Sequence, residues 1–85
     1  MEELKKLRDQ IKNFDEEIVK LLEKRFNLSL KIGELKKENN LPILDKDREK
    51  ELLLINLSKL ENKDFSESYL NIFKTILEES KKLQK

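Results

Sequence analysis

The sequence predicts a single all-α domain, and three observations support this prediction. The chain has 85 residues, which is enough for one domain at most. Glycine and proline occur once each, so long helices are possible and tight β-turns are scarce. Apolar residues also recur with heptad spacing from residue 4 to residue 35, which is typical of an amphipathic helix.

The first predicted helix runs from residue 3 to about residue 39. Its heptad seam is Leu4, Leu7, Ile11, Phe14, Ile18, Leu21, Arg25, Leu28, Ile32 and Leu35. At 1.5 Å per residue this helix is roughly 55 Å long, which exceeds the diameter of so small a globule. Part of it must therefore pack against another chain or project into water. A second apolar stripe indicates that other helices cover it from the middle onward: Val19, Leu22, Phe26 and Leu30.

Gly33 lies inside this helix, where glycine costs about 0.5–1 kcal/mol relative to alanine. Close approach of another helix or a ligand would explain it, and so would a tolerated accident. The helix is expected to end at Asn39-Asn40, before Leu41-Pro42. Asparagine tolerates the left-handed cap conformation, and proline disfavours a helical conformation in the residue before it.

Two shorter helices are expected after a short loop. The second helix is predicted from about residue 45 to residue 60, with Asp45 or Asp47 as its N-cap. The segment Asp64-Phe65-Ser66-Glu67 resembles a capping box and predicts the start of the third helix. That helix is expected to run close to the C-terminus.

Composition excludes several classes of function. The 19 basic and 18 acidic residues alternate and leave a net charge of +1, so a nucleic-acid-binding surface is not expected. The absence of cysteine and histidine removes thiol nucleophiles, zinc-finger ligands and imidazole acid–base chemistry. No apolar run approaches membrane-spanning length and no signal peptide is recognisable, so we expect a cytoplasmic protein. The thin hydrophobic fraction of 36% favours oligomerisation.

Only three of the basic residues are arginine: Arg8, Arg25 and Arg48. Arginine binds a carboxylate or phosphate at two points, which lysine does not. Arg25 also interrupts the apolar seam, where an unpaired buried charge is costly. It either fixes register or pairs with an internal carboxylate, or it belongs to a site for a small, multiply anionic molecule. Arg48, in the first turn of the second helix, is either solvated or part of the same site.

Two helical stripes would form the walls of such a site. On the first helix, Arg25 and Lys36 bracket Ser29 and Ile32 on one face. On the third helix, the inward stripe turns from apolar to neutral polar at its end: Phe73, Leu77, Ser80 and Gln84. Its last two members are either pocket donors or frayed surface residues.

Arg8 precedes Arg25 by seventeen residues, which is roughly 25 Å along a helix. One helix therefore cannot bring both arginines onto one small ligand. An antiparallel helix of a second copy would deliver its own Arg8 to the first copy's Arg25. This geometry predicts a dimer with shared sites.

These residues together resemble the all-helical class of chorismate mutases. The matching segments are Leu7-Arg8-Asp9-Gln10-Ile11, Asp15-Glu16, Leu21-Leu22-Glu23-Lys24-Arg25, Ile32-Gly33-Glu34-Leu35-Lys36, residues 41–49, Glu79-Ser80 and Gln84. The resemblance covers essentially the whole chain. It implies one domain over residues 1–85, a three-helix protomer with a long N-terminal helix, and an intertwined homodimer. It implies neither a metal nor a cofactor.

The resemblance also implies a reaction, the [3,3] rearrangement of chorismate to prephenate in phenylalanine and tyrosine biosynthesis. That reaction needs no proton transfer and no covalent intermediate, so the missing histidine and cysteine do no harm. The resemblance implies that Arg25, Arg48 and a partner-derived Arg8 hold the two carboxylates, with Ser80 supporting a carboxylate. It implies that Lys36 and Gln84 bond to the ether oxygen, with Lys36 also near a carboxylate, and that Glu49 and the Asp45 region take the ring hydroxyl. The helical stripe described above places Ile32 beneath the substrate.

Lys81 departs from the family pattern, because relatives often carry an apolar residue facing the pocket there. We expect its stem to pack while its ammonium group reaches solvent. Two alternative functions remain open. One is an isochorismate–pyruvate lyase of the same fold, and the other is a non-catalytic helical dimerisation module. The heptads favour the module, but it gives no reason for the positions of Arg25, Lys36 and Arg48.

Overall fold

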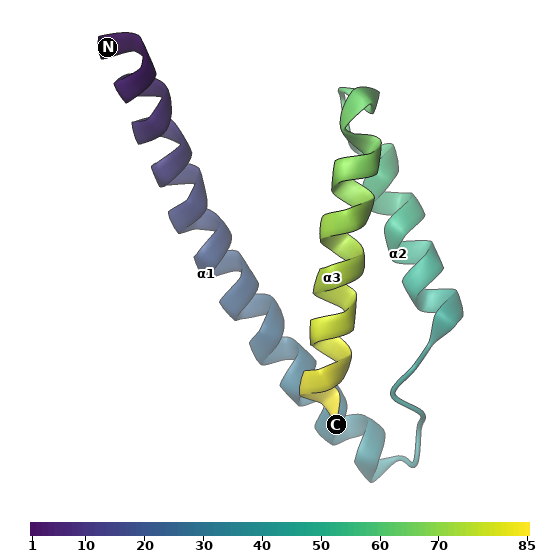
Figure 1. Ribbon diagram of the computed structural model, residues 1–85. Helices are drawn as coiled ribbons and strands as arrows, with labels where there is room; N and C mark the ends of the chain where they lie inside the picture. The colour runs from purple at the N-terminus through teal and green to yellow at the C-terminus, as the bar shows by residue number, and fades with distance from the viewer.

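The computed structural model describes residues 1–85 and contains only helices. Its elements are α1 (Glu2–Glu38), α2 (Lys46–Ser58), the short 3-10 helix η1 (Lys63–Phe65) and α3 (Ser66–Gln84). Figure 1 shows α2 and α3 side by side, with the end of α3 crossing the C-terminal part of α1. The N-terminal part of α1 extends away alone. The prediction of an all-α, three-helix chain is confirmed.

The protomer is elongated because α1 is longer than the rest of the fold. The chain measures 57 × 25 × 15 Å and has a radius of gyration of 16.2 Å. A compact domain of this length would have a radius of gyration of about 12 Å. The difference arises from the projecting half of α1, which no other part of the protomer covers.

The small core lies where the C-terminal part of α1 meets α3. Its buried residues are Ser29 and Gly33 from α1, and Leu77 and Ser80 from α3. Only one of these four is a large apolar residue. Of the second apolar stripe, Leu22 and Phe26 are half-buried, whereas Val19 and Leu30 stay exposed.

Gly33 is required by the close approach of α3. A Cβ atom at this position would lie 2.6 Å from both the Cα and the carbonyl oxygen of Gln84. Both are backbone atoms, so they could not yield by a change of rotamer. Of the two explanations for Gly33, close approach of another helix is therefore the correct one.

The first helix ends as its sequence predicts. Asn40 has a φ of 54°, in the left-handed region. The Leu41 amide donates to the Lys36 carbonyl over 2.8 Å, and the Asn40 amide donates to the Lys37 carbonyl over 3.3 Å. This pair of bonds is the Schellman arrangement, which satisfies the last carbonyl groups of α1.

The start of α2 is confirmed, and its end differs slightly from the prediction. The Asp45 carboxylate accepts from the Arg48 amide over 3.0 Å, which makes Asp45 the N-cap. The helix ends at Ser58, two residues before the predicted residue 60. There the Lys63 ammonium donates to the carbonyl groups of Leu57 and Ser58, each over 3.3 Å, and so satisfies the helix terminus.

The predicted capping box before α3 is wrong. Instead, the Asn62 side chain caps η1 by accepting from the Asp64 amide over 3.0 Å. The Ser66 hydroxyl donates back to the Lys63 carbonyl over 2.7 Å. No side chain caps α3 itself, whose N-cap is Phe65. A single turn of 3-10 helix thus leads into α3 and replaces the side-chain cap.

The projecting half of α1 presents an apolar stripe to solvent in the isolated protomer. The seam residues Leu7, Ile11, Phe14 and Ile18 are each between 51% and 62% exposed. These side chains are the ones that the heptad pattern assigns to a helix–helix contact. No helix of the protein is both long enough and apolar enough to cross a membrane.

Candidate active site

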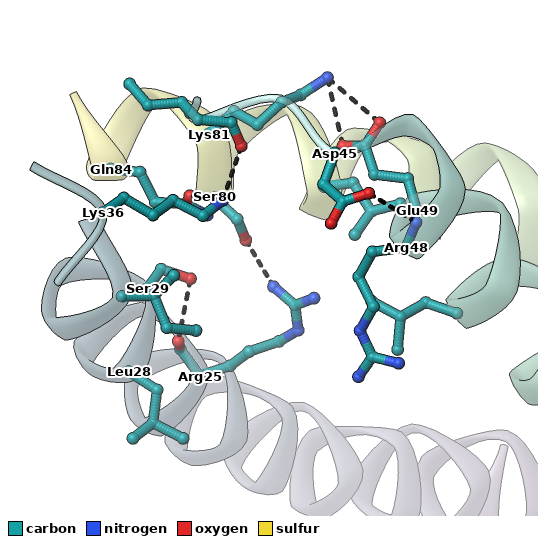
Figure 2. Close-up of a pocket in the computed structure, with 14 residues that line it drawn as sticks. Arg25, Leu28, Ser29, Lys36, Asp45, Arg48, Glu49, Ser80, Lys81 and Gln84 are labelled. Atoms are coloured by element: carbon teal, nitrogen blue, oxygen red, sulfur yellow. Dashed lines mark hydrogen bonds and ion pairs between the residues drawn. The ribbon is translucent and has the colours of Figure 1, made fainter. Parts of the chain in front are cut away.

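A cavity of about 370 Å³ lies between α1, α2 and α3. This volume is within the range of small-molecule sites, roughly 300–1,000 Å³. The sequence predicts nine site residues. The structure brings eight of them together around this cavity: Arg25, Ile32, Lys36, Asp45, Arg48, Glu49, Ser80 and Gln84. Figure 2 shows how the labelled side chains converge from the three helices.

Arg25 projects into the cavity from α1 and has no carboxylate partner within the protomer. Its Nη1 donates to the Ser80 hydroxyl over 2.5 Å. The Ser29 hydroxyl, one turn along α1, donates to the Arg25 backbone carbonyl over 3.2 Å. A guanidinium group has five N–H donors, so most of the donors of Arg25 are free for an anion. The internal ion pair that could have explained Arg25 is absent.

Lys36 ties together three parts of the chain at one end of the cavity. Its ammonium donates to the Ile43 carbonyl over 2.7 Å and to the Gln84 side-chain oxygen over 2.7 Å. An ammonium has three N–H donors, so one remains for a ligand. Since the Gln84 oxygen is occupied, its NH₂ group is also left to donate. Gln84 is half-buried, and the interpretation of it as a frayed surface residue is wrong.

The first turn of α2 supplies Asp45, Arg48 and Glu49. The Asp45 carboxylate is engaged as the helix cap. The Arg48 guanidinium lies 3.3 Å from Glu51, but both side chains are more than half exposed. Such an exposed pair is worth little, so Arg48 can turn to a ligand at small cost. Figure 2 shows its guanidinium directed away from Glu49.

Glu49 pairs with Lys81 of α3. The Lys81 ammonium lies 3.3 Å from one Glu49 carboxylate oxygen and 3.5 Å from the other. The two side chains are only 30% and 25% exposed. The expectation for Lys81 did not include this pairing of its ammonium with the carboxylate on α2.

The electrostatic balance of the cavity favours a dianion. Its lining carries four cations, Arg25, Lys36, Arg48 and Lys81, against the carboxylates of Asp45 and Glu49. The difference is a net charge of +2. The protein has no cluster of three or more carboxylate, histidine or cysteine side chains that could hold a metal ion. Aliphatic residues complete the wall: Leu28, Ile32, Ile43, Leu52 and Leu77.

The two clearly shifted pKa values belong to residues outside this cavity. Burial raises the pKa of the Tyr69 hydroxyl, and a hydrogen bond with Asn56 opposes the shift. The hydroxyl donates to the Leu53 carbonyl over 3.2 Å and so ties α3 to α2. The hydrogen bond and charge of Glu79 raise the pKa of Lys82 on the exposed face of α3.

Arg8 is the one predicted site residue that does not line the cavity of the protomer. It lies on the projecting half of α1 and is exposed. Sequence reasoning also missed two features of the site. The backbone carbonyl of Ile43 as a partner of Lys36 has no signal in the sequence. The position of Lys81, directly after Ser80 on the inward side of α3, could have indicated that it belongs to the site. Its partner, the Glu49 carboxylate, lies 32 positions away in the sequence and could not be predicted.

The fold and the cavity define a class, a small all-helical protein with a pocket whose lining carries a net positive charge. Comparison with protein families is more specific. Residues 7–85 match the family described as chorismate mutase type II. The chain belongs to that family, as its sequence resemblance predicted.

Individual relatives agree with the family match. The chain is 49% identical over 80 residues to a bifunctional chorismate mutase/prephenate dehydratase of Buchnera aphidicola, covering 92% of this chain and 20% of the relative. It is 33% identical over 87 residues to a chorismate mutase of Methanocaldococcus jannaschii, covering 100% of this chain and 87% of the relative. The chain thus spans about a fifth of the length of its bifunctional Buchnera relative.

A solved structure has the same fold. It is a conserved hypothetical protein from Pyrococcus furiosus, 43% identical in sequence, with a TM-score of 0.79. The match covers 96% of this chain and 95% of that chain. The similarity therefore extends over all three helices.

Proposed function

We propose that residues 1–85 form one chorismate mutase domain that converts chorismate to prephenate. The observation that carries this proposal is the cavity with a net charge of +2, in which Arg25 has no carboxylate partner. Chorismate is a dicarboxylate, so its charge matches that of the lining. The names of the relatives agree with this assignment and with a role in aromatic amino acid biosynthesis.

The two arginines of the cavity would hold the two substrate carboxylates. A planar guanidinium binds a carboxylate through two parallel N–H donors. Arg25 is held toward the cavity by its bond to Ser80, and Arg48 gives up only an exposed surface pair when it turns inward. Holding both carboxylates would bring the enolpyruvyl arm over the ring, the geometry that the rearrangement requires.

Lys36 and Gln84 would stabilise the transition state at the ether oxygen. Negative charge develops there as the C–O bond breaks, and fixed donors lower the energy of that charge. The remaining N–H of Lys36 and the NH₂ group of Gln84 are the two donors available at this end of the cavity. A rate acceleration of about a millionfold needs roughly 8 kcal/mol. Gln84 does not titrate, so its contribution would not depend on pH.

The other side of the substrate would face α2. The Glu49 carboxylate, with the Asp45 region beside it, would accept the hydrogen bond of the ring hydroxyl. Ile32 on the wall of α1 would pack against the substrate and exclude water from the reacting atoms. No step in this scheme requires a general base.

We further propose that the protein acts as an intertwined homodimer. The exposed seam residues of α1, such as Ile11 and Phe14, would be covered by α1 of a second copy. Each large side chain that changes from half-exposed to buried adds roughly 1 kcal/mol. An antiparallel second α1 would carry its Arg8 into the first copy's cavity, as a further cation for a substrate carboxylate.

The test is turnover of chorismate by the purified chain without added metal or cofactor. We expect Arg25→Ala to reduce kcat/KM at least a thousandfold and Lys5→Ala, on the exposed part of α1, to leave it unchanged. Arg25→Lys keeps the charge but not the planar fork and should recover little activity. Wild-type activity in Arg25→Ala would contradict the proposal. Product analysis with isochorismate separates it from the lyase alternative, which would release pyruvate.

A further inference from the structure

The Lys81–Glu49 pair differs from the other ion pairs of the protein. Arg48–Glu51 and Lys82–Glu79 each join residues three positions apart on one helix, with side chains that are 50–67% exposed. Lys81–Glu49 joins α3 to α2, and its side chains are only 30% and 25% exposed. Both residues line the cavity (Figure 2). The pair is thus part of the site rather than a surface contact.

Glu49 is a carboxylate that lies among the cations of the cavity, and a bound dianion would need those cations as partners. Arg25 has no carboxylate partner in the protomer, and Arg48 has only the exposed Glu51. The Arg25 guanidinium would be a strong competitor for a carboxylate that was free to move, because paired N–H donors favour that geometry. Arg48 directly precedes Glu49 on α2, and neighbouring side chains of a helix do not face each other. A Glu49 bound to Arg25 would occupy the donors that a substrate carboxylate needs.

Lys81 offers Glu49 a different partner. Its ammonium contacts both Glu49 oxygens and holds the carboxylate toward α3. A carboxylate has about four lone-pair positions, so Glu49 can still accept a hydrogen bond from a ligand. Lys81 also contributes to the charge match, since without it the lining of the cavity would carry +1 instead of +2.

We propose that Lys81 is a positioning residue, which holds Glu49 away from Arg25 so that this guanidinium remains open to a carboxylate of the substrate. This inference rests on the proposed mutase function. It predicts that loss of Lys81 weakens substrate binding in the ground state and the transition state alike. Such a loss appears in KM, while kcat changes little.

The experiment measures kcat and KM for chorismate in a set of matched variants. Lys81→Met keeps the length of the side chain without its charge, and we expect KM to rise about tenfold with kcat within twofold. Lys81→Arg keeps a cation and should stay within threefold of the wild-type KM. The control is Lys82→Met, which removes a charge from the next position on α3 without touching the cavity, and which should change neither constant.

The role of Glu49 is tested in a Glu49→Gln background. With no carboxylate to misplace, Lys81→Met should raise KM less than twofold there. An equal rise in both backgrounds would mean that Lys81 acts only as a general positive charge and would overturn the inference. So would an unchanged KM in the single variant, or a loss confined to kcat.

Two further outcomes are separable. If Lys81→Met does not fold, as judged by circular dichroism, Lys81→Gln provides a second neutral side chain and the same KM rise is expected. If the wild-type chain does not turn over chorismate, the proposed function and this inference fail together. If the wild type is active and the Lys81 variants match it, the inference alone fails.

Discussion

Gly33 offers a sharp test of how the end of α3 supports the site. In Gly33→Ala the new Cβ would lie 2.6 Å from two backbone atoms of Gln84. Non-bonded carbon atoms are most stable at about 3.5–4.0 Å, so the end of α3 must move by roughly 1 Å. That displacement is enough to break the 2.7 Å hydrogen bond between Lys36 and Gln84. Gly33→Ala therefore disturbs Lys36 and Gln84, the proposed donors to the ether oxygen, without replacing either residue.

The magnitude follows from the role proposed for Gln84. Loss of one preorganised donor to a developing negative charge costs about a hundredfold to a thousandfold in kcat. Stability should change much less. Alanine gains about 0.5–1 kcal/mol over glycine within α1, and this gain offsets part of the cost of overpacking, about 1–3 kcal/mol. We therefore expect a large loss of kcat with a small shift in Tm.

The assay compares Gly33→Ala, Gln84→Ala and the double variant in chorismate turnover and thermal unfolding. If Gly33 acts through Gln84, the double variant should be no slower than Gln84→Ala alone. Lys31→Ala, on the exposed side of α1, controls for the helix propensity of alanine. A wild-type kcat in Gly33→Ala, or fully additive losses in the double variant, would refute this reasoning.

Two other predictions concern the dimer and the packing of α3. Mixing inactive Arg8→Ala with inactive Arg25→Ala under subunit exchange should restore one working site of two in each heterodimer, and no recovery after verified exchange would count against a shared site. Tyr69→Phe should cost about 1 kcal/mol in the free energy of unfolding without changing kcat, because it removes the bond to the Leu53 carbonyl. Burial raises the pKa of Tyr69 above its ordinary value of 10.0, so the protonated hydroxyl stabilises the fold fully below pH 10.0. This contribution is lost as pH rises through the pKa of Tyr69 in the folded protein. The stabilities of the wild type and of Tyr69→Phe should therefore converge in alkaline unfolding measurements as pH passes that folded pKa.

The boundaries of the helices illustrate which local signals can be read without a structure. Asn40 before Leu41-Pro42 correctly predicted the left-handed end of α1, because that cap depends only on adjacent residues. The start of α2 was predicted with Asp45 or Asp47 as its N-cap, and the structure shows that the N-cap is Asp45. The capping box predicted from Asp64 to Glu67 was wrong, since the chain enters α3 through a turn of 3-10 helix that Asn62 caps instead.

The site residues illustrate the limit of helical periodicity. The register of α1 placed Arg25 and Lys36 on one face, and that of α3 placed Ser80 and Gln84 on another. Periodicity alone does not say that these two faces meet, and the family resemblance supplied that expectation. The Lys81–Glu49 pair was missed because it depends on the distance between α2 and α3.

The sequence by itself determined the three helices, the charge-rich face around Arg25 and the apolar seam of α1. Each of these follows from the spacing of residues along one helix, which the backbone geometry converts directly into a shared face. Only the tertiary structure decided that Gly33 is obligatory, that Gln84 accepts from Lys36 and that Lys81 holds Glu49. These contacts depend on how closely separate helices approach, and a shift of about 1 Å is enough to make or break them.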